Sequence, residues 1–72
     1  MEQAFARVAT WEAVRTSRYK YVHYLDLKDM DELYDLQADS GEMKNLIGDP
    51  SAKSTLASMR KLLETYRKEV RA

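Results

Sequence analysis

Apolar and polar side chains alternate along the first half of this chain with a period of two residues. That period is typical of a β-strand, in which successive side chains point to opposite faces of a sheet. Over residues 8–16, one face would carry Trp11, Ala13 and Arg15, and the other would carry Thr10, Glu12, Val14 and Thr16. Because β-branched and aromatic residues are common in this run, we predict a strand here. Residues 1–7 show no decisive period and fit either a helical turn or an extended lead.

A second alternating run covers residues 19–26 and extends the predicted sheet. One of its faces would carry Tyr19, Tyr21, His23 and Leu25, and the other would carry Lys20, Val22 and Tyr24. The polar residues 16–18 have the length of a hairpin turn, although they lack the Asn-Gly or Gly that marks a tight one. After the polar loop 27–30, residues 32–36 predict a short third strand, and a loop of this length favours antiparallel pairing.

The last third of the chain changes to the period of a helix. Asp49 suits an N-cap and Pro50 suits the first helical position, and no glycine or proline follows before the chain ends. Apolar side chains then recur at steps of three and four and form one stripe: Leu56, Met59, Leu63, Tyr66 and Val70. At under three heptads, such a stripe more often covers a sheet than pairs with a second helix.

The loop between the sheet and the helix contains a capping-box spacing, because Asp39 stands three positions before Glu42. We therefore predict one tight helical turn over residues 42–46. The predicted fold class is α+β: a small antiparallel sheet of two to four strands with a C-terminal amphipathic helix packed on one face. The chain forms a single domain whose four parts are a lead segment at 1–7, strands within 8–36, a loop at 37–49 and a helix at 50–71.

Composition limits the partners of the chain and the sources of its stability. Twelve basic and twelve acidic residues cancel, so no net field draws the chain to nucleic acid or to an anionic membrane. The absence of cysteine excludes disulfides and thiolate metal sites. No signal-peptide pattern is present, and no apolar run approaches the roughly 20 residues that cross a bilayer. Because so short a chain buries only about 60% of its unfolded surface, it depends on packing or on a partner surface.

Isolated features of the chain give weak evidence of chemistry. His23 is the only histidine, and a lone imidazole on a strand is more often a packing or hydrogen-bonding group than a catalyst. A solvated loop explains the acidic group better than a calcium site does, because the glycine and ligand spacing of a calcium loop is missing from Asp29, Asp31, Glu32 and Asp35. The basic and aromatic residues Arg18, Tyr19, Lys20, Tyr21 and Tyr24 resemble the exposed strand of single-stranded RNA readers, but the glycines of those readers are missing and the net charge of the chain is zero.

Four blocks, in their order and spacing, carry a resemblance to a known family. They are Arg15-Thr-Ser-Arg-Tyr-Lys-Tyr-Val-His-Tyr, Glu32-Leu-Tyr-Asp-Leu, Asp39-Ser-Gly-Glu with Asn45-Leu46, and the Asp49-Pro50 step into the terminal helix. Over about residues 10–70 the chain resembles the C-terminal subdomain of the sulfatase family, in the branch of N-sulfoglucosamine sulfohydrolases and bacterial arylsulfatase-like enzymes. Ser40 stands where this family usually has proline, which lowers the rigidity of one loop.

The resemblance implies a non-catalytic part of a hydrolase. In this family the nucleophile is a formylglycine made from the first residue of a Cys/Ser-x-Pro-x-Arg motif, and it lies beside a calcium ion in a larger α/β domain. The only proline here, Pro50, has no arginine two places on, so no catalytic, cofactor-binding or metal-binding residue carries over to this chain. We expect the chain alone to be inactive and to hold no cofactor. The parent enzyme would use calcium and formylglycine to hydrolyse sulfate esters or sulfamates of a carbohydrate.

The resemblance also implies partners. The small sheet and helix would dock on the catalytic domain of the parent sulfatase, which the resemblance places in the periplasm or outside the cell. Cations suit sulfate oxygens, so the expected contacts in the wall of the substrate cleft are Arg15, Arg18, Lys20 and His23. The isolated chain would expose its docking face, and we expect it to self-associate as a two-fold homodimer. Neither nucleic acid nor a membrane is an expected partner.

Two other functions remain open at this point. A stand-alone protein-interaction module is the main alternative, because Met1 is compatible with a true start of the chain. A single-stranded nucleic-acid-binding module is the less favoured one, since the net charge is zero.

Overall fold

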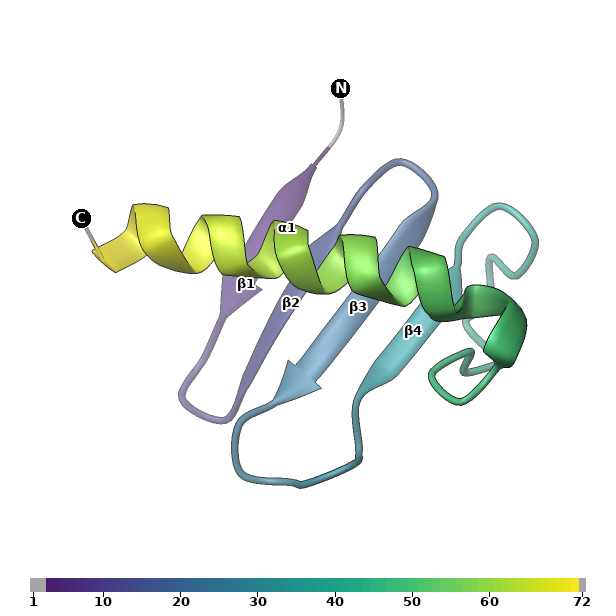
Figure 1. Ribbon diagram of the computed structural model, residues 1–72, viewed down its shortest axis with the longest axis horizontal. Coiled ribbons are helices and arrows are strands. Elements are labelled where there is room, and N and C mark those ends of the chain that lie inside the picture. The colour runs from purple at the N-terminus through teal and green to yellow at the C-terminus, as the bar shows by residue number, and fades with distance from the viewer. Residues whose placement is uncertain (1–2, 72) are drawn as a thin grey trace.

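A computed structural model describes the backbone of residues 3–71 and the side chains of residues 3–69, and this part of the chain forms one sheet and one long helix (Figure 1). The four strands lie side by side in chain order and are β1 (Ala4–Arg7), β2 (Trp11–Arg15), β3 (Tyr19–Tyr24) and β4 (Glu32–Asp35). Each strand is antiparallel to the next. A 3₁₀ turn, Pro50–Ala52, leads into α1 (Lys53–Arg71), which crosses one face of the sheet and leaves the other face uncovered.

The predicted α+β class is confirmed, and three of the four strands lie within the predicted runs. The fourth strand, β1, lies in the lead segment, where an extended chain and a helical turn were equally compatible with the sequence. Its conformation comes from tertiary contacts, because Phe5 pairs with Val14 across the sheet and stacks on Tyr66 of α1 with ring centroids 5.2 Å apart. The lead is therefore extended over Ala4–Arg7, and Met1 and Glu2 lie outside the described residues.

The helical turn predicted over residues 42–46 is wrong, because this segment is irregular. The Asp39 carboxylate does accept backbone hydrogen bonds, from the amides of Met43 at 3.0 Å and Lys44 at 2.8 Å. Glu42, however, has a left-handed φ of 54° and binds Lys20 Nζ at 2.8 Å, so it does not complete a capping box. The loop instead runs beside the free edge of β4, to which it is tied at Leu33.

The loop covers that edge through two hydrogen bonds to the backbone of Leu33. The Leu33 amide donates to Asn45 Oδ1 at 3.0 Å, and the Leu33 carbonyl accepts from the Leu46 amide at 2.7 Å. An uncovered edge would leave unpaired backbone groups that invite pairing with another chain. The loop thus protects β4, which leaves β1 as the outer strand at the other edge of the sheet.

The core lies between α1 and the face of the sheet that it covers. Cross-strand pairing aligns Val14, Tyr21 and Leu33 in one row, and all three are at most 2% exposed. The predicted apolar stripe of the helix packs on this row through Leu56, Met59, Leu63 and Tyr66, whereas the side chain of Val70 lies outside the described residues. The stripe therefore covers the sheet, as its short length predicted. Within the described part of the chain, no helix is long and apolar enough to cross a membrane.

The helix begins where the sequence predicts. The Asp49 carboxylate accepts a hydrogen bond from the Ser51 amide at 2.9 Å, and Pro50 occupies the first position of the 3₁₀ turn. This bond satisfies one of the backbone donors that a helix start leaves without an internal partner.

A buried carboxylate fastens the far end of the helix to the sheet. Glu12 is 2% exposed, and its two oxygens accept from Arg7 Nε and Arg67 Nε, each at 2.7 Å. Burial raises the pKa of the Glu12 carboxyl, but the hydrogen bonds from Arg67 and Arg7 outweigh it and leave the pKa below its ordinary value of 4.5. One side chain of β2 thus joins β1 and α1, which are remote in sequence.

We expect Leu63→Ala to lower the free energy of unfolding by about 2–4 kcal/mol, because it opens a cavity under α1 where Leu63 is 2% exposed. Urea unfolding followed by circular dichroism measures the change. The matched control is Lys61→Ala on the exposed side of the same helix, which should stay within about 0.5 kcal/mol of the parent chain. Equal effects of the two substitutions would contradict this account of the core.

We expect Glu12→Gln to destabilise the chain by about 1–3 kcal/mol near pH 7 and to have little effect in acid. The folded pKa of Glu12 is lowered, so its stabilisation is complete above the unfolded value near 4.5 and disappears as the pH falls through the folded pKa. Unfolding free energies of both chains, measured between pH 7 and pH 2.5, give the difference. A difference that stays constant across this range would exclude the ionised clamp.

Candidate functional site

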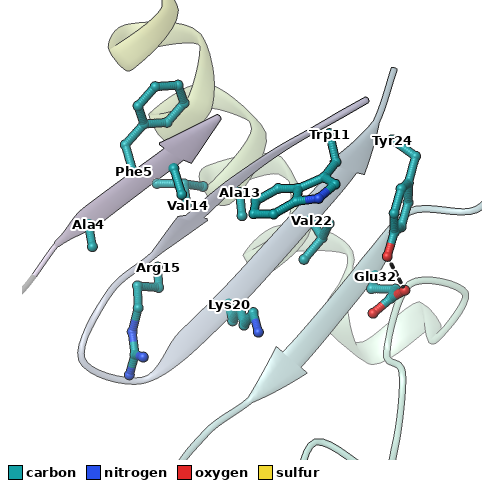
Figure 2. Close-up of a pocket in the computed structure, with 11 residues that line it drawn as sticks. Ala4, Phe5, Trp11, Ala13, Val14, Arg15, Lys20, Val22, Tyr24 and Glu32 are labelled. Carbon is teal, nitrogen blue, oxygen red and sulfur yellow. Dashed lines mark hydrogen bonds between the residues drawn. The ribbon is translucent and has the colours of Figure 1, made fainter. Parts of the chain in front are cut away.

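The face of the sheet opposite α1 is the first candidate site, and we call it the open face (Figure 2). Its residues line a shallow hollow of about 520 Å³ and include Ala4, Ala6, Trp11, Ala13, Arg15, Lys20, Val22, Tyr24 and Glu32. The hollow exists because β1 and β2 present alanines here, whose side chains are too short to fill the space above the backbone. The indole of Trp11 extends along the face toward Ala13 and Val22 (Figure 2). A bulky group from a second layer would fit above the alanine floor.

The polar groups at the border of the open face are mostly held in place. Glu32 accepts from the hydroxyls of Tyr24 and Tyr34, each at 2.8 Å, and its hydrogen bond raises the pKa of Tyr34 to about 12. Lys20 is paired with Glu42. Arg15, in contrast, is exposed and makes no ion pair with any of the described side chains. The border therefore offers one guanidinium to an acidic partner.

A second candidate site lies on the helix side of the sheet, and we call it the Asp31 cluster, made of Tyr21, His23, Asp31 and Arg60. The Asp31 carboxylate accepts from the Tyr21 hydroxyl at 2.6 Å and lies 3.0 Å from His23 Nδ1. Arg60 Nε of α1 donates to the Tyr21 hydroxyl at 3.4 Å. Burial raises the pKa of Asp31, but the hydrogen bonds from Tyr21 and His23 outweigh it and lower that pKa overall.

Burial of the Tyr21 phenol and its hydrogen bond to Asp31 both raise the pKa of Tyr21. Tyr21 therefore stays a neutral donor at physiological pH. The cluster borders two hollows beside α1, of about 380 and 660 Å³, and His23, Asp31 and Arg60 line both. The chemistry that the cluster offers is an oriented imidazole next to an exposed guanidinium.

The structure separates the four residues that the sequence predicted in one wall of the substrate cleft. Arg15 and Lys20 are cross-strand neighbours on the open face. Arg18 lies in the turn between β2 and β3, where its guanidinium binds Asp35 at 3.1 Å and covers the Tyr19 ring. His23 lies on the opposite face, in the Asp31 cluster. The structure therefore brings Arg15 and Lys20 together, but not all four residues.

The acidic group around β4 is also divided between the faces of the sheet. Asp31 and Asp35 have side chains only 14% and 13% exposed and are hydrogen-bonded, so the expectation of a solvated loop is wrong for them. Glu32 points to the open face. Among the described residues, no three acidic or imidazole side chains converge as a metal site would require. We assign no chemical step through calcium to them.

Arg60 was not among the site residues predicted from the sequence. Its position beside Met59 and between Leu56 and Leu63 places it at the border of the apolar stripe, which was the available signal. Its contact with Tyr21 joins residues 39 positions apart and follows only from where α1 crosses β3.

Comparison with known proteins identifies the relatives of this chain. The family described as N-sulphoglucosamine sulphohydrolase, C-terminal, matches residues 2–69. A curated relative, the Delta 4,5-hexuronate-2-O-sulfatase of Bacteroides thetaiotaomicron, is 51% identical over 53 residues, which are 74% of this chain and 11% of that protein. This chain therefore spans about a tenth of the length of the curated relative that it matches.

Solved structures show the same fold. A 2-O GAG sulfatase and a Bacteroides thetaiotaomicron protein solved as a putative sulfatase each superpose with a TM-score of 0.77 and 46% identity, over 82% of this chain and 12% of theirs. A third protein, solved in complex with its substrate D-glucosamine-2-N,6-O-disulfate, has a TM-score of 0.77 at 24% identity, over 93% of this chain and 15% of its own. This third likeness concerns the fold alone.

We predict that the isolated chain self-associates at millimolar concentration through its open face, and that Ala13→Arg weakens this association at least tenfold. An arginine in the alanine floor fills the hollow and brings a charge to its centre. Light scattering over a concentration series measures the effect. Ala57→Arg on the exposed side of α1 is the matched control and should leave the association unchanged. A chain that stays monomeric at millimolar concentration would remove the prediction.

Proposed function

This chain belongs to the N-sulphoglucosamine sulphohydrolase C-terminal family of sulfatases, and on that premise we propose that it is the non-catalytic C-terminal subdomain of a carbohydrate sulfatase. The family match over nearly the whole chain, which nevertheless spans only about a tenth of its curated relative, carries this proposal. The parent enzyme would hydrolyse sulfate esters or sulfamates of a carbohydrate, because the relatives are named for sulfate groups on hexuronate and GAG. The formylglycine nucleophile and the calcium ion would both belong to the catalytic domain.

We propose that the open face seats the catalytic domain. A second layer packs about 10 Å from a sheet and inserts side chains between those of the first layer, which requires space such as the alanine floor provides. The centre of the other face is already covered by α1. The domain that covers the open face would bring apolar side chains to Trp11 and the hollow, and a carboxylate to Arg15.

The positions of the four predicted cations support a division of their roles. Arg15 and Lys20 lie on the open face, so we propose that they contact acidic groups of the catalytic domain. Arg18 is already neutralised by Asp35. His23 is the member of the set that lies beside an open hollow of the other face, so the substrate-facing role fits it best.

A chimera tests the proposed function. We expect the hexuronate 2-O-sulfatase to keep measurable sulfate release when its matching segment is replaced by this chain, because the two are 51% identical there. Ala13→Arg in the chimera should abolish activity by preventing docking, whereas Ala57→Arg should not, since Ala57 is on the exposed side of α1.

The isolated chain should not hydrolyse an aryl sulfate in the presence of calcium, since it lacks a Cys/Ser-x-Pro-x-Arg motif. Turnover by the isolated chain would contradict the proposal. So would a chimera that tolerates both substitutions equally.

A further inference from the structure

We infer that His23 and Arg60 form a binding subsite for an anionic sugar, a pyranose that carries a carboxylate or a sulfate group. This inference rests on the proposed function, because it assigns the substrate-facing role of this subdomain to the two hollows beside α1.

Asp31 fixes the orientation and the tautomer of His23. Its carboxylate accepts from the Tyr21 hydroxyl at 2.6 Å and from the Tyr24 amide at 3.3 Å, so it has little freedom to rotate. An ionised carboxylate is an acceptor only, so the proton of the neutral imidazole must lie on Nδ1, which is 3.0 Å away. Nε2 is then an unprotonated acceptor, and none of the described residues forms a hydrogen bond with it. This nitrogen is ready to accept a sugar hydroxyl.

Arg60 supplies a permanent positive charge beside His23. Its side chain is exposed, and its Nε donates to Tyr21, which holds the base of the guanidinium near the cluster. No ion pair of Arg60 occurs within the described part of the chain, so both terminal nitrogens are open to a ligand. The neighbouring cation, Arg67, is instead neutralised by Glu12 and Glu64. A guanidinium whose two terminal nitrogens are both open matches the paired oxygens of a carboxylate or a sulfate.

The shape of the surface agrees with a sugar ligand. Hollows of about 380 and 660 Å³ meet at His23, Asp31 and Arg60, and each lies in the size range of small-molecule sites. Their walls combine apolar side chains with polar ones, which include Glu64 and Asp29. An apolar ligand would leave these groups without partners, whereas the hydroxyls of a sugar would satisfy them.

A purely structural cluster would need none of these features. Asp31 already satisfies Tyr21 and the Tyr24 amide, and a neutral histidine adds only one further hydrogen bond to it. The inference therefore predicts two separate observables, which are the tautomer of His23 and the binding of an anionic sugar at Arg60.

Nuclear magnetic resonance on the 72-residue chain measures both observables. Long-range ¹H–¹⁵N spectra should show His23 protonated on Nδ1 at pH 7.5. N-acetylglucosamine 6-sulfate and glucuronate, added at constant ionic strength, should shift the His23 and Arg60 side-chain signals at millimolar concentration. Neutral N-acetylglucosamine should bind at least tenfold more weakly. Whichever of the two anionic probes binds more tightly shows whether the subsite prefers sulfate or carboxylate.

Variants separate the two parts of the subsite. Arg60→Gln should weaken the binding of both anionic sugars at least tenfold and leave the His23 tautomer unchanged. The control is Lys68→Gln, at an exposed position of the same helix, which should change neither the binding nor the tautomer. Asp31→Asn should allow both tautomers of His23 to be populated and should also weaken the binding of the anionic sugars. If that variant does not fold, Tyr21→Phe removes the hydroxyl that donates to Asp31 and accepts from Arg60 Nε, and it should have the same effects at smaller size.

Two results would overturn the inference. One is that the His23 and Arg60 signals do not shift at tens of millimolar sugar. The other is that Arg60→Gln and Lys68→Gln lower the affinity for the anionic sugars equally. Either result leaves the chimera test of the proposed function unaffected. Conversely, if the chimera is inactive but the isolated chain binds anionic sugars specifically, the sulfatase role is rejected and the subsite is supported.

Discussion

A single helix can cover only one face of a four-stranded sheet, and this limit organises the whole molecule. The covered face holds the core, where the row Val14, Tyr21 and Leu33 meets Met59 and Leu63. The other face keeps Trp11 and an alanine-floored hollow exposed to solvent. Among the described residues, no second helix lies on that face. The open face is therefore where a larger partner would be expected to pack.

Two carboxylates, those of Glu12 and Asp31, lie between the helix and the sheet, and they have different roles. Glu12 is deeply buried, and its two oxygens are both taken by guanidinium groups, so it has no capacity left for a ligand. Asp31 is bound mainly by neutral donors, and it leaves an imidazole and a guanidinium facing solvent. The first arrangement fastens α1 to the sheet. The second arrangement resembles a binding site, because its imidazole and guanidinium are oriented and still have atoms free to bind a ligand.

In the proposed assembly, this chain and the catalytic domain have different roles. The sequence contains no Cys/Ser-x-Pro-x-Arg motif, and the acidic residues around β4 in the described part of the chain are divided between the two faces of the sheet. What the subdomain offers is a rigid sheet with one packed and one open face. In the proposed assembly, the open face binds the catalytic domain, and the Asp31 cluster faces the sugar. The rigidity of the hydrogen-bonded network around Asp31 would then matter more than the affinity of any single contact.

The sequence by itself determined the local elements: β2, β3 and β4 from the two-residue alternation, α1 from its stripe and from Asp49 and Pro50, and the sulfatase likeness from the spacing of four blocks. Only the tertiary structure decided that the lead pairs as β1 and that residues 42–46 are held irregular by bonds to β3 and β4. It also decided which cations share a face. The physical reason is distance along the chain: periodicity reports which side a residue faces within its own element. The bonds of Glu12 to Arg67 and of Tyr21 to Arg60 instead join residues 55 and 39 positions apart, and they exist only because α1 crosses the sheet at one angle and register.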